Sequence, residues 1–240
     1  MAITRIIGDI HGMVNDCRAY LLHDFQGSAI QVGDFGIGMG QSDYWHESVD
    51  ALCKEYDLTF IRGNHDNPAK CKEMYGWIKD GTVKNNTMFI GGAWSIDNPD
   101  APTGWYKRTS GVDWWPEEEL SDEEFTRILE IYATIKPEIV ISHDCPASIS
   151  NTMFKKSGII KGPWYYNRTS DWLDKFMQVH QPQIYIFGHW HHTALHIHDN
   201  TYFMCLGELD YIDLDLNNIE QSKNRMIEKV SPSTSFPTFF

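Results

Sequence analysis

The sequence lacks the features that mark disulfide-stapled and membrane-spanning proteins. Its five cysteines are odd in number, scattered, and free of any Cys-x-x-Cys pair, which argues for reduced thiols in a cytosol-like compartment. The chain has no run of about 18 apolar residues that would cross a membrane. Ile3 opens a strand pattern with no basic and apolar leader before it. We therefore expect a cytoplasmic protein with no membrane partner.

Basic residues are also scarce, because 20 Lys and Arg stand against 33 Asp and Glu for a formal net charge of −13. Such a chain attracts the nucleic-acid backbone poorly, since that binding depends on Lys and Arg that release counterions. This charge disfavours nucleic acid as a partner. The 240 residues suit one domain that buries roughly 70 to 75% of its unfolded surface without any disulfide.

The first half of the chain alternates strands with helices. Apolar, β-branched runs predict strands at 3–8, 28–33 and 58–62, separated by helices near 13–25 and 42–56. This βαβαβ order is typical of a parallel sheet.

A second sheet is expected to begin at a hairpin around Asn85-Asn86, after a short helix near 68–76. Ser121 and Glu124 form a capping-box signature and predict a helix over 122–135. The remaining apolar runs predict a helix near 170–179 and strands at 138–142, 184–188, 194–198, 201–206 and 209–216. The last three of these strands are expected to form a meander.

We expect one domain over residues 1–216, with a long aromatic insertion loop at 92–120. A loop of this length is usually functional or disordered. Residues 217–240 are polar, and we expect them to form a loosely attached tail.

Five short blocks rich in Asp, His and Asn follow five of the predicted strands. Parallel strands bring their carboxyl ends to one edge of a sheet, where open α/β folds place their sites. We therefore expect the polar side chains of these blocks to converge. The blocks are Gly8-Asp9-Ile10-His11-Gly12, Gly33-Asp34, Gly63-Asn64-His65-Asp66, Ser142-His143-Asp144 and Gly188-His189-Trp190-His191.

The blocks contain enough ligands for two divalent metal ions. Carboxylate, imidazole and amide donors suit Mn above all, with Fe, Zn, Co or Ni as alternatives, and they suit Ca less well. In a two-metal site one carboxylate generally bridges both ions, and a bridging water loses its proton near neutral pH. About +4 from the ions against −2 from Asp9 and Asp34 leaves a positive pocket that favours a small phosphorylated substrate.

The five blocks resemble the signature of the calcineurin-like metallophosphoesterases, which reads D-x-H, G-D, G-N-H-[DE], H and G-H-x-H. The resemblance implies a four-layer α/β/β/α sandwich of two mixed β-sheets flanked by helices. It also implies that one metal is held by Asp9, His11 and His191, that Asp34 bridges, and that the second metal is held by Asn64, His143 and His189. His65 would be the catalytic residue, which protonates the leaving oxygen or steadies the phosphoryl charge.

Two departures separate the chain from the serine/threonine phosphatases of this superfamily. Their second block continues as G-D-x-x-D-R-G, with the later Asp orienting the catalytic His, but this chain has Ile37 at that position. Either Asp66, Asp144 or a backbone carbonyl then orients His65, or His65 acts as a weaker acid. The second departure is the aromatic loop, where Arg108 is the leading candidate for substrate binding together with Asn64 and His65. Alternatively, Arg108 is a solvated charge and the loop's tryptophans form a packed cluster.

The sequence therefore predicts metal-dependent hydrolysis of a phosphate ester by a hydroxide that bridges the metals. The substrate is expected to be a small phosphoester or a nucleotide, and the choice between monoester and diester stays open. Two alternatives come from other classes of protein. One is a nuclease, which the acidic composition disfavours, and the other is a non-catalytic metal-binding scaffold on the same fold. The sequence gives no indication of the oligomeric state.

Overall fold

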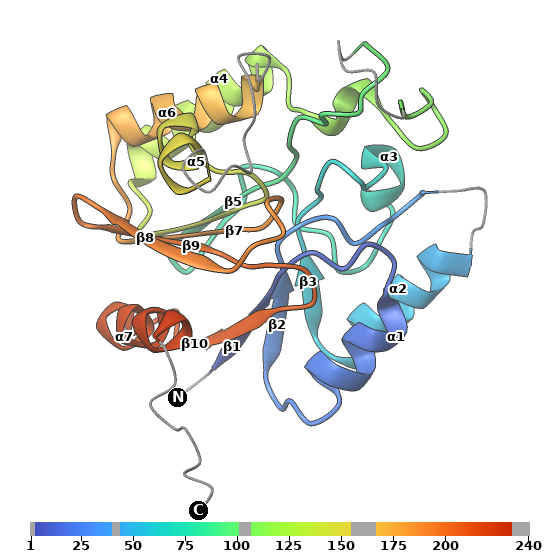
Figure 1. Cartoon of the computed structure of the whole chain (residues 1–240), viewed down its shortest axis with the longest axis horizontal. Coiled ribbons are helices and arrows are strands. Elements are labelled where there is room, and N and C mark those ends of the chain that lie inside the picture. The colour runs from blue at the N-terminus through green and yellow to red at the C-terminus, as the bar shows by residue number, and fades with distance from the viewer. Residues whose placement is uncertain (1–2, 40–43, 101–106, 155–166, 232–240) are drawn as a thin grey trace, which may run out of the picture.

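The computed structural model describes residues 3–39, 44–100, 107–154 and 167–231, which form two β-sheets packed face to face between helices (Figure 1). The smaller sheet has the strand order β10-β1-β2-β3. Strands β1, β2 and β3 run parallel, as the βαβαβ order predicts, and β10 is antiparallel to β1. The bounds are β1 (Thr4–Ile7), β2 (Ser28–Gln31), β3 (Leu58–Phe60) and β10 (Tyr211–Leu214).

The larger sheet has the strand order β4-β5-β6-β7-β9-β8. It starts with the predicted hairpin, whose turn residues Asn85 and Asn86 both have positive φ. Strands β5, β6, β7 and β9 are parallel, and β8 pairs antiparallel with β9. The bounds are β4 (Val83–Lys84), β5 (Thr87–Ile90), β6 (Ile139–Ser142), β7 (Ile184–Phe187), β8 (Ala194–His198) and β9 (Thr201–Cys205).

Helices cover the outer faces of both sheets. Helix α4 begins at the predicted capping box, in which the Ser121 hydroxyl accepts from the Glu124 N–H at 3.2 Å and the Glu124 carboxylate accepts from the Ser121 N–H at 2.9 Å. Such a box satisfies two backbone donors and stabilises a helix by about 1 kcal/mol. The helices are α1 (Val14–Asp16) continuing as the π-helix η1 (Cys17–Leu22), α2 (Tyr44–Glu55), α3 (Pro68–Cys71), the 3₁₀-helix η2 (Pro116–Glu118), α4 (Asp122–Ile135), α5 (Ala147–Met153), α6 (Arg168–Val179) and α7 (Ile219–Val230).

Three apolar clusters define four layers. One fills the space between the sheets and contains Ile6, Ile141 and Met204. A second lies between the larger sheet and helices α4, α5 and α6, and a third lies between the smaller sheet and helices α1 and α2 (Figure 1). The order helix, sheet, sheet, helix confirms the predicted α/β/β/α sandwich of two mixed sheets.

The predicted meander of closing strands is wrong for its last member. Strands β8 and β9 form an antiparallel hairpin, but β10 leaves that sheet and pairs with β1. Its residues Ile212 and Leu214 are buried in the cluster between the sheets. An alternating apolar pattern indicates a strand but does not specify which sheet the strand joins.

The prediction of a loosely attached tail is wrong for residues 219–230, which form α7. Asn218 caps this helix, and Met226 is fully buried in the cluster between the sheets. A helix with such a narrow apolar stripe has a polar composition, which misleads a judgement from composition alone. Residues 232–240 lie outside the described residues. The division into a domain of residues 1–216 and a tail stays a prediction.

All five cysteines are buried and unpaired. Among the described residues, no helix combines the length and apolar character needed to cross a bilayer. The cellular compartment stays a prediction.

Candidate metal centre

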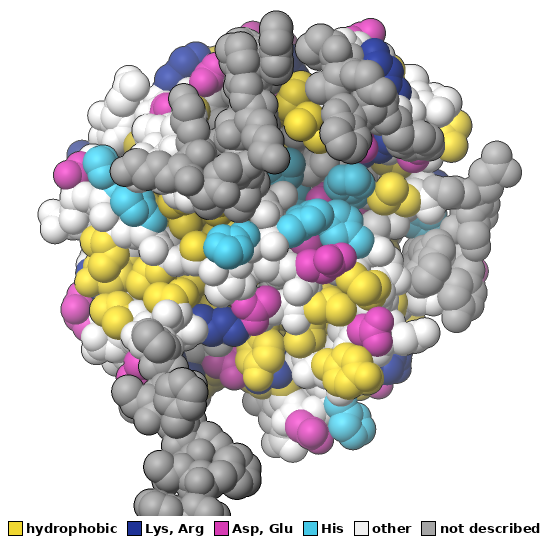
Figure 2. Space-filling view, in the orientation of Figure 1, with side chains coloured by type: hydrophobic (Ala, Val, Ile, Leu, Met, Phe, Trp, Pro, Cys, Tyr) yellow, Lys and Arg dark blue, Asp and Glu magenta, His cyan; other side chains and the backbone are white. Residues whose placement is uncertain are grey.

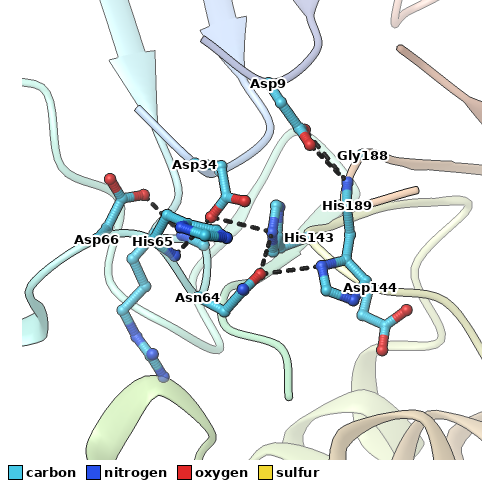
Figure 3. Close-up of polar contacts among 12 residues, drawn as sticks. Asp9, Asp34, Asn64, His65, Asp66, His143, Asp144, Gly188 and His189 are labelled. Atoms are coloured by element: carbon cyan, nitrogen blue, oxygen red, sulfur yellow. Dashed lines mark hydrogen bonds and ion pairs between the residues drawn. The ribbon is translucent and has the colours of Figure 1, made fainter. Parts of the chain in front are cut away.

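The structure brings the five sequence blocks together at one edge of the two sheets. The blocks follow β1, β2 and β3 of the smaller sheet and β6 and β7 of the larger one. In Figure 3 the side chains of Asp34, Asn64, His143 and His189 lie together, and the Asp9 carboxylate faces the backbone of His189. The space-filling view shows histidine and acidic side chains gathered across this face (Figure 2).

The first ligand group consists of Asp9, His11, Asp34 and His191, whose ligand atoms all lie within 4.8 Å of one another. His191 Nε2 is 3.3 Å from Asp9 Oδ2 and 2.9 Å from His11 Nε2. His11 Nε2 is 3.7 Å from Asp34 Oδ2. This group is open to solvent, since the His191 side chain is 49% exposed.

The second ligand group consists of Asp34, His143 and His189, joined by the amide oxygen of Asn64. Asn64 Oδ1 lies 3.1 Å from His143 Nε2 and 2.9 Å from His189 Nδ1, and His143 Nε2 lies 3.2 Å from Asp34 Oδ1 (Figure 3). Asp34 therefore belongs to both groups. Its two oxygens face different partners, which is the arrangement of a carboxylate that bridges two cations.

The electrostatics of the centre favour bound positive charge. Burial lowers the pKa of His143, but Asp34 and Asp9 more than offset this effect and raise it to about 10. Burial would raise the pKa of Asp34, yet the neighbouring rings of His143, His65 and His11 hold it well below its usual range. Asp34 Oδ2 is buried and has no hydrogen-bond partner among the described residues. A buried carboxylate oxygen normally has a partner, and a divalent cation would supply one.

The donor set fits divalent transition metals. It combines carboxylate oxygens, an amide oxygen and imidazole nitrogens, and it contains no thiolate. The side chains that would hold the ions include all seven residues that the sequence indicates as ligands. That these residues bind metal stays a prediction.

Four of the seven side chains are presented by strained backbone. His11, Asp34, His189 and His191 have φ values of 46°, 61°, 66° and 48°. This left-handed conformation costs a residue with a side chain about 1 kcal/mol, and it persists where the surrounding structure imposes it. The strain turns each side chain toward the centre directly after a strand end.

Two glycines let the loops approach each other closely. A Cβ atom at Gly63 would overlap the Asp34 carboxylate, and one at Gly188 would overlap the Asp9 carboxylate. The Asp9 carboxylate instead accepts from the His189 N–H, with 3.1 Å between N and Oδ2. Gly63 and Gly188 therefore allow the close contact between loops.

His65 lies beside the first ligand group, with its ring centroid 4.9 Å from that of His11. Its backbone N–H donates to Asp34 Oδ1 at 2.7 Å. Burial lowers the pKa of its ring to about 4, and its Nδ1 has no hydrogen-bond partner among the described residues.

Neither acidic residue suggested by the sequence orients His65. The Asp66 carboxylate accepts from four backbone N–H groups in the loops after β2 and β3, at 2.8 to 3.2 Å. The Asp144 carboxylate accepts from Asn167, Ser170, the Trp190 indole and the Cys145 N–H. Both carboxylates instead fix the loops that carry the candidate ligands, a role that the sequence did not indicate.

Arg108 is buried beside the second ligand group and is 3% exposed. Its guanidinium donates to the Asn64 carbonyl at 2.9 Å, to the Asp97 carboxylate at 2.8 Å and to the Asp113 carbonyl at 3.2 Å. These contacts hold the Asn64 loop, and the predicted contact with substrate stays a prediction. The aromatic residues just before it, at 105 and 106, lie outside the described residues.

Sequence reasoning missed two buried residues of the aromatic loop that contact this site. Ser95 is 1% exposed and its hydroxyl accepts from Asn64 Nδ2 at 3.0 Å. Glu118 is 2% exposed and its carboxylate accepts from both the hydroxyl and the N–H of Ser95. No local motif marks these two residues, because their role depends on contacts across 23 to 31 positions of sequence.

The site and fold agree with the comparison to known families. The sequence profile described as calcineurin-like phosphoesterase matches residues 4–193, so the chain belongs to that family. Family membership indicates a metal-dependent phosphoester hydrolase. No curated protein matches the chain significantly.

Solved structures with a similar fold include a phosphopantetheinyl hydrolase from Mycobacterium tuberculosis (14% identity, TM-score 0.47), which covers 97% of this chain and 94% of its own. A putative 5'-nucleotidase from Staphylococcus aureus (13% identity, TM-score 0.49) covers 89% of this chain, which spans 51% of that protein. A serine/threonine phosphatase from Saccharomyces cerevisiae (13% identity, TM-score 0.37) matches over 86% of this chain and 67% of its own length. Likenesses at this level do not identify a substrate.

Proposed function

We propose that this chain hydrolyses a small phosphate ester or nucleotide with two divalent metal ions held by the two ligand groups. The observation that supports this most directly is the shared Asp34 carboxylate, which contributes to both groups and has one buried oxygen without a hydrogen-bond partner among the described residues. Manganese is the first metal to test, since the donors combine carboxylate, amide oxygen and imidazole.

When bound, such a pair of ions supplies Lewis acidity for the phosphoryl oxygens and lowers the pKa of a water molecule enough to make it a nucleophile. The chain's own contribution is to place the ligands and to exclude competing water. His11 and His191, whose side chains are 18% and 49% exposed, form the open side of the centre, so the phosphoryl group would approach from there. Asn64 and His143 form its buried side, and His189 is partly exposed.

His65 is the residue proposed to act on the phosphoryl group directly. Its lowered pKa, about 4, keeps the ring neutral at pH 7. A neutral imidazole still donates one N–H, so it can stabilise the charge that develops on an equatorial oxygen. This favours hydrogen bonding to the phosphoryl group over protonation of the leaving oxygen.

The test is a panel of substrates assayed with the Mn²⁺-loaded protein. The panel holds an aryl phosphomonoester, an aryl phosphodiester, a cyclic nucleotide and a dinucleoside polyphosphate. Turnover of at least one, abolished by chelator and restored by Mn²⁺, would support the proposal. Inertness toward all four with two ions bound would favour a non-catalytic scaffold. Cleavage of single-stranded DNA or RNA in preference to all four would favour a nuclease.

A further inference from the structure

The second ligand group depends on which way the amide of Asn64 faces. The oxygen and nitrogen ends of an Asn side chain have nearly the same shape, but only the oxygen can bind a cation. Asn64 Oδ1 lies 2.9 to 3.1 Å from the two imidazoles of this group. Some feature of the fold must therefore disfavour the flipped amide, which would turn an NH₂ group toward the cation.

A chain of buried hydrogen bonds starts at the opposite end of this amide. Asn64 Nδ2 donates to Ser95 Oγ at 3.0 Å, and Ser95 Oγ donates to Glu118 Oε2 at 2.5 Å. The Ser95 N–H donates to the other carboxylate oxygen, Glu118 Oε1, at 2.9 Å. All three residues are at most 3% exposed, so water does not compete for these partners.

The carboxylate at the end of this chain sets its direction. At pH 8, above its pKa of about 7, the Glu118 carboxylate is ionised and only accepts hydrogen bonds, and a serine hydroxyl has a single proton to donate. With that proton given to Glu118, Ser95 Oγ can only accept from Asn64. The amide must then present its NH₂ to Ser95 and its oxygen to His143 and His189.

Two arginines hold Glu118 in place. Arg108 Nη2 lies 3.4 Å from Glu118 Oε2 and supplies a compensating charge. Arg62 donates to the carbonyls of Glu117 and Glu118 at 2.9 and 2.8 Å, and its Nε pairs with Asp80 at 3.0 Å. The backbone and the carboxylate of Glu118 are thus both anchored.

We propose that Ser95 and Glu118 are positioning residues that orient the Asn64 amide for the second metal ion. This inference rests on the proposed function, because it presupposes a cation at the second ligand group. It gives a role to both ends of the segment from 92 to 120, because Ser95 lies near one end and Glu118 near the other, and their hydrogen bonds lead to the candidate ligand Asn64. Residues that hydrogen-bond to a metal ligand in this way typically change metal affinity by about 10 to 100-fold.

The sharpest test is Glu118→Gln, which keeps the shape of the side chain and reverses the direction of the hydrogen bonds from Asn64 to residue 118. Because the Ser95 N–H needs an acceptor, the Gln oxygen would take the place of Oε1 and its NH₂ would face Ser95 Oγ. The hydroxyl proton would then point at Asn64 and favour the flipped amide. Ser95→Ala removes the hydrogen bonds that link Asn64 to Glu118. The matched controls are Glu119→Gln, whose carboxylate accepts from Thr169, and Ser222→Ala, a buried serine of α7 that donates to the Asp215 carbonyl.

The measurement is Mn²⁺ titration by calorimetry, together with electron paramagnetic resonance of the exchange-coupled ion pair. We expect wild type and both controls to bind two ions. We expect Glu118→Gln and Ser95→Ala to bind the second ion about 10 to 100-fold more weakly, with loss of the coupled signal at Mn²⁺ concentrations that saturate wild type. Ser95→Thr, which retains the hydroxyl, should recover part of the affinity.

The failures are distinguishable. Wild type that binds no Mn²⁺ would overturn the proposed function and this inference with it. Wild type that binds two ions while Glu118→Gln and Ser95→Ala bind both as tightly would overturn this inference alone. Equal weakening of both ions would also overturn it, because that result would indicate a general structural role.

Discussion

The two ligand groups differ in how the protein surrounds them. In the first group the His11 and His191 side chains are 18% and 49% exposed, and their rings lie next to each other and to the Asp9 carboxylate. In the second group His143 is fully buried and Asn64 is 3% exposed. Both groups nevertheless share Asp34. Asp34 thus joins the first group, which we call the open half of the centre, to the second group, which we call the closed half.

This difference indicates a division of labour within the centre. Two ligands of the closed half have a partner behind them, since His143 Nδ1 bonds the Val32 carbonyl at 2.9 Å and the Asn64 amide bonds Ser95. Such outer contacts fix ring orientation and strengthen metal binding. The open half has fewer of them and remains accessible. We infer that the closed half retains its ion while the open half exchanges ion, water and substrate.

The largest effect is expected for Asp34→Asn, because it removes the carboxylate that both groups share. An amide cannot bridge two cations with two anionic oxygens. We expect turnover to fall by roughly 10³-fold or more and bound Mn²⁺ to fall below one ion per chain. Elemental analysis and the aryl phosphate assay check both quantities.

The control for this substitution is Asp215→Asn, at a buried aspartate that accepts from the Asn217 N–H. It should retain both ions. If Asp34→Asn retained two tightly bound ions, the bridging role would be wrong and the two groups would be independent sites.

A smaller effect is expected for His65→Ala, which should spare both halves of the centre. His65 Nδ1 has no hydrogen-bond partner among the described residues, and His65 belongs to neither ligand group, so metal content should stay at two ions per chain. Turnover should fall by about 10² to 10³-fold, the range usual for one positioned donor. His180→Ala, at a partly buried histidine remote from the site, is the control. Loss of metal from His65→Ala would show that His65 is a ligand.

The convergence of the candidate ligands of both halves was largely predictable from the sequence, and so was the fold around them. Apolar, β-branched runs place β1, β2, β3, β6 and β7, and their parallel arrangement forces the following residues to one edge. The blocks that follow them contain all seven ligands. These features can be predicted because strand ends and glycine turns are determined by residues close to them in the sequence.

The supports of the site were not predictable, because they depend on contacts between distant segments. Ser95 and Glu118 have no motif, and Arg108 carries a charge that the sequence assigns equally well to substrate or solvent. The same holds for β10, whose sequence pattern fits either sheet. The positive φ values of His11 and His191 were equally hidden, since local preference opposes them and tertiary structure imposes them.

The contrast between the halves can be measured by removing metal. With Zn²⁺ in both positions and a chromogenic chelator in excess, we expect two phases of release that differ about tenfold or more in rate. His191→Ala should accelerate the fast phase and leave the slow one unchanged, whereas Asn64→Ala should accelerate the slow one. A single phase in wild type, or the opposite assignment of phases, would contradict the division into an open and a closed half.

The smallest effect is a pH dependence of stability that originates behind the closed half. Burial raises the pKa of Glu118 from 4.5 to about 7, although Ser95 and Arg108 lower it in part. A raised carboxyl pKa means that the folded state holds the proton more tightly than the unfolded state. Its contribution is therefore fully present below about pH 4.5 and is lost as the pH rises through about 7.

Comparison with Glu118→Gln isolates this contribution, because the amide does not titrate. The free energy of unfolding of wild type minus that of the variant, measured by urea denaturation of chelator-treated protein, should fall between pH 5 and pH 8. We expect a decrease on the order of 1 kcal/mol, since neighbouring donors can relax around the ionised group. A difference that stays constant, or rises with pH, would show that Glu118 is ionised throughout. In that case the hydrogen-bond chain to Asn64 would keep its direction at every pH in the range, and the closed half would be insensitive to protonation behind it.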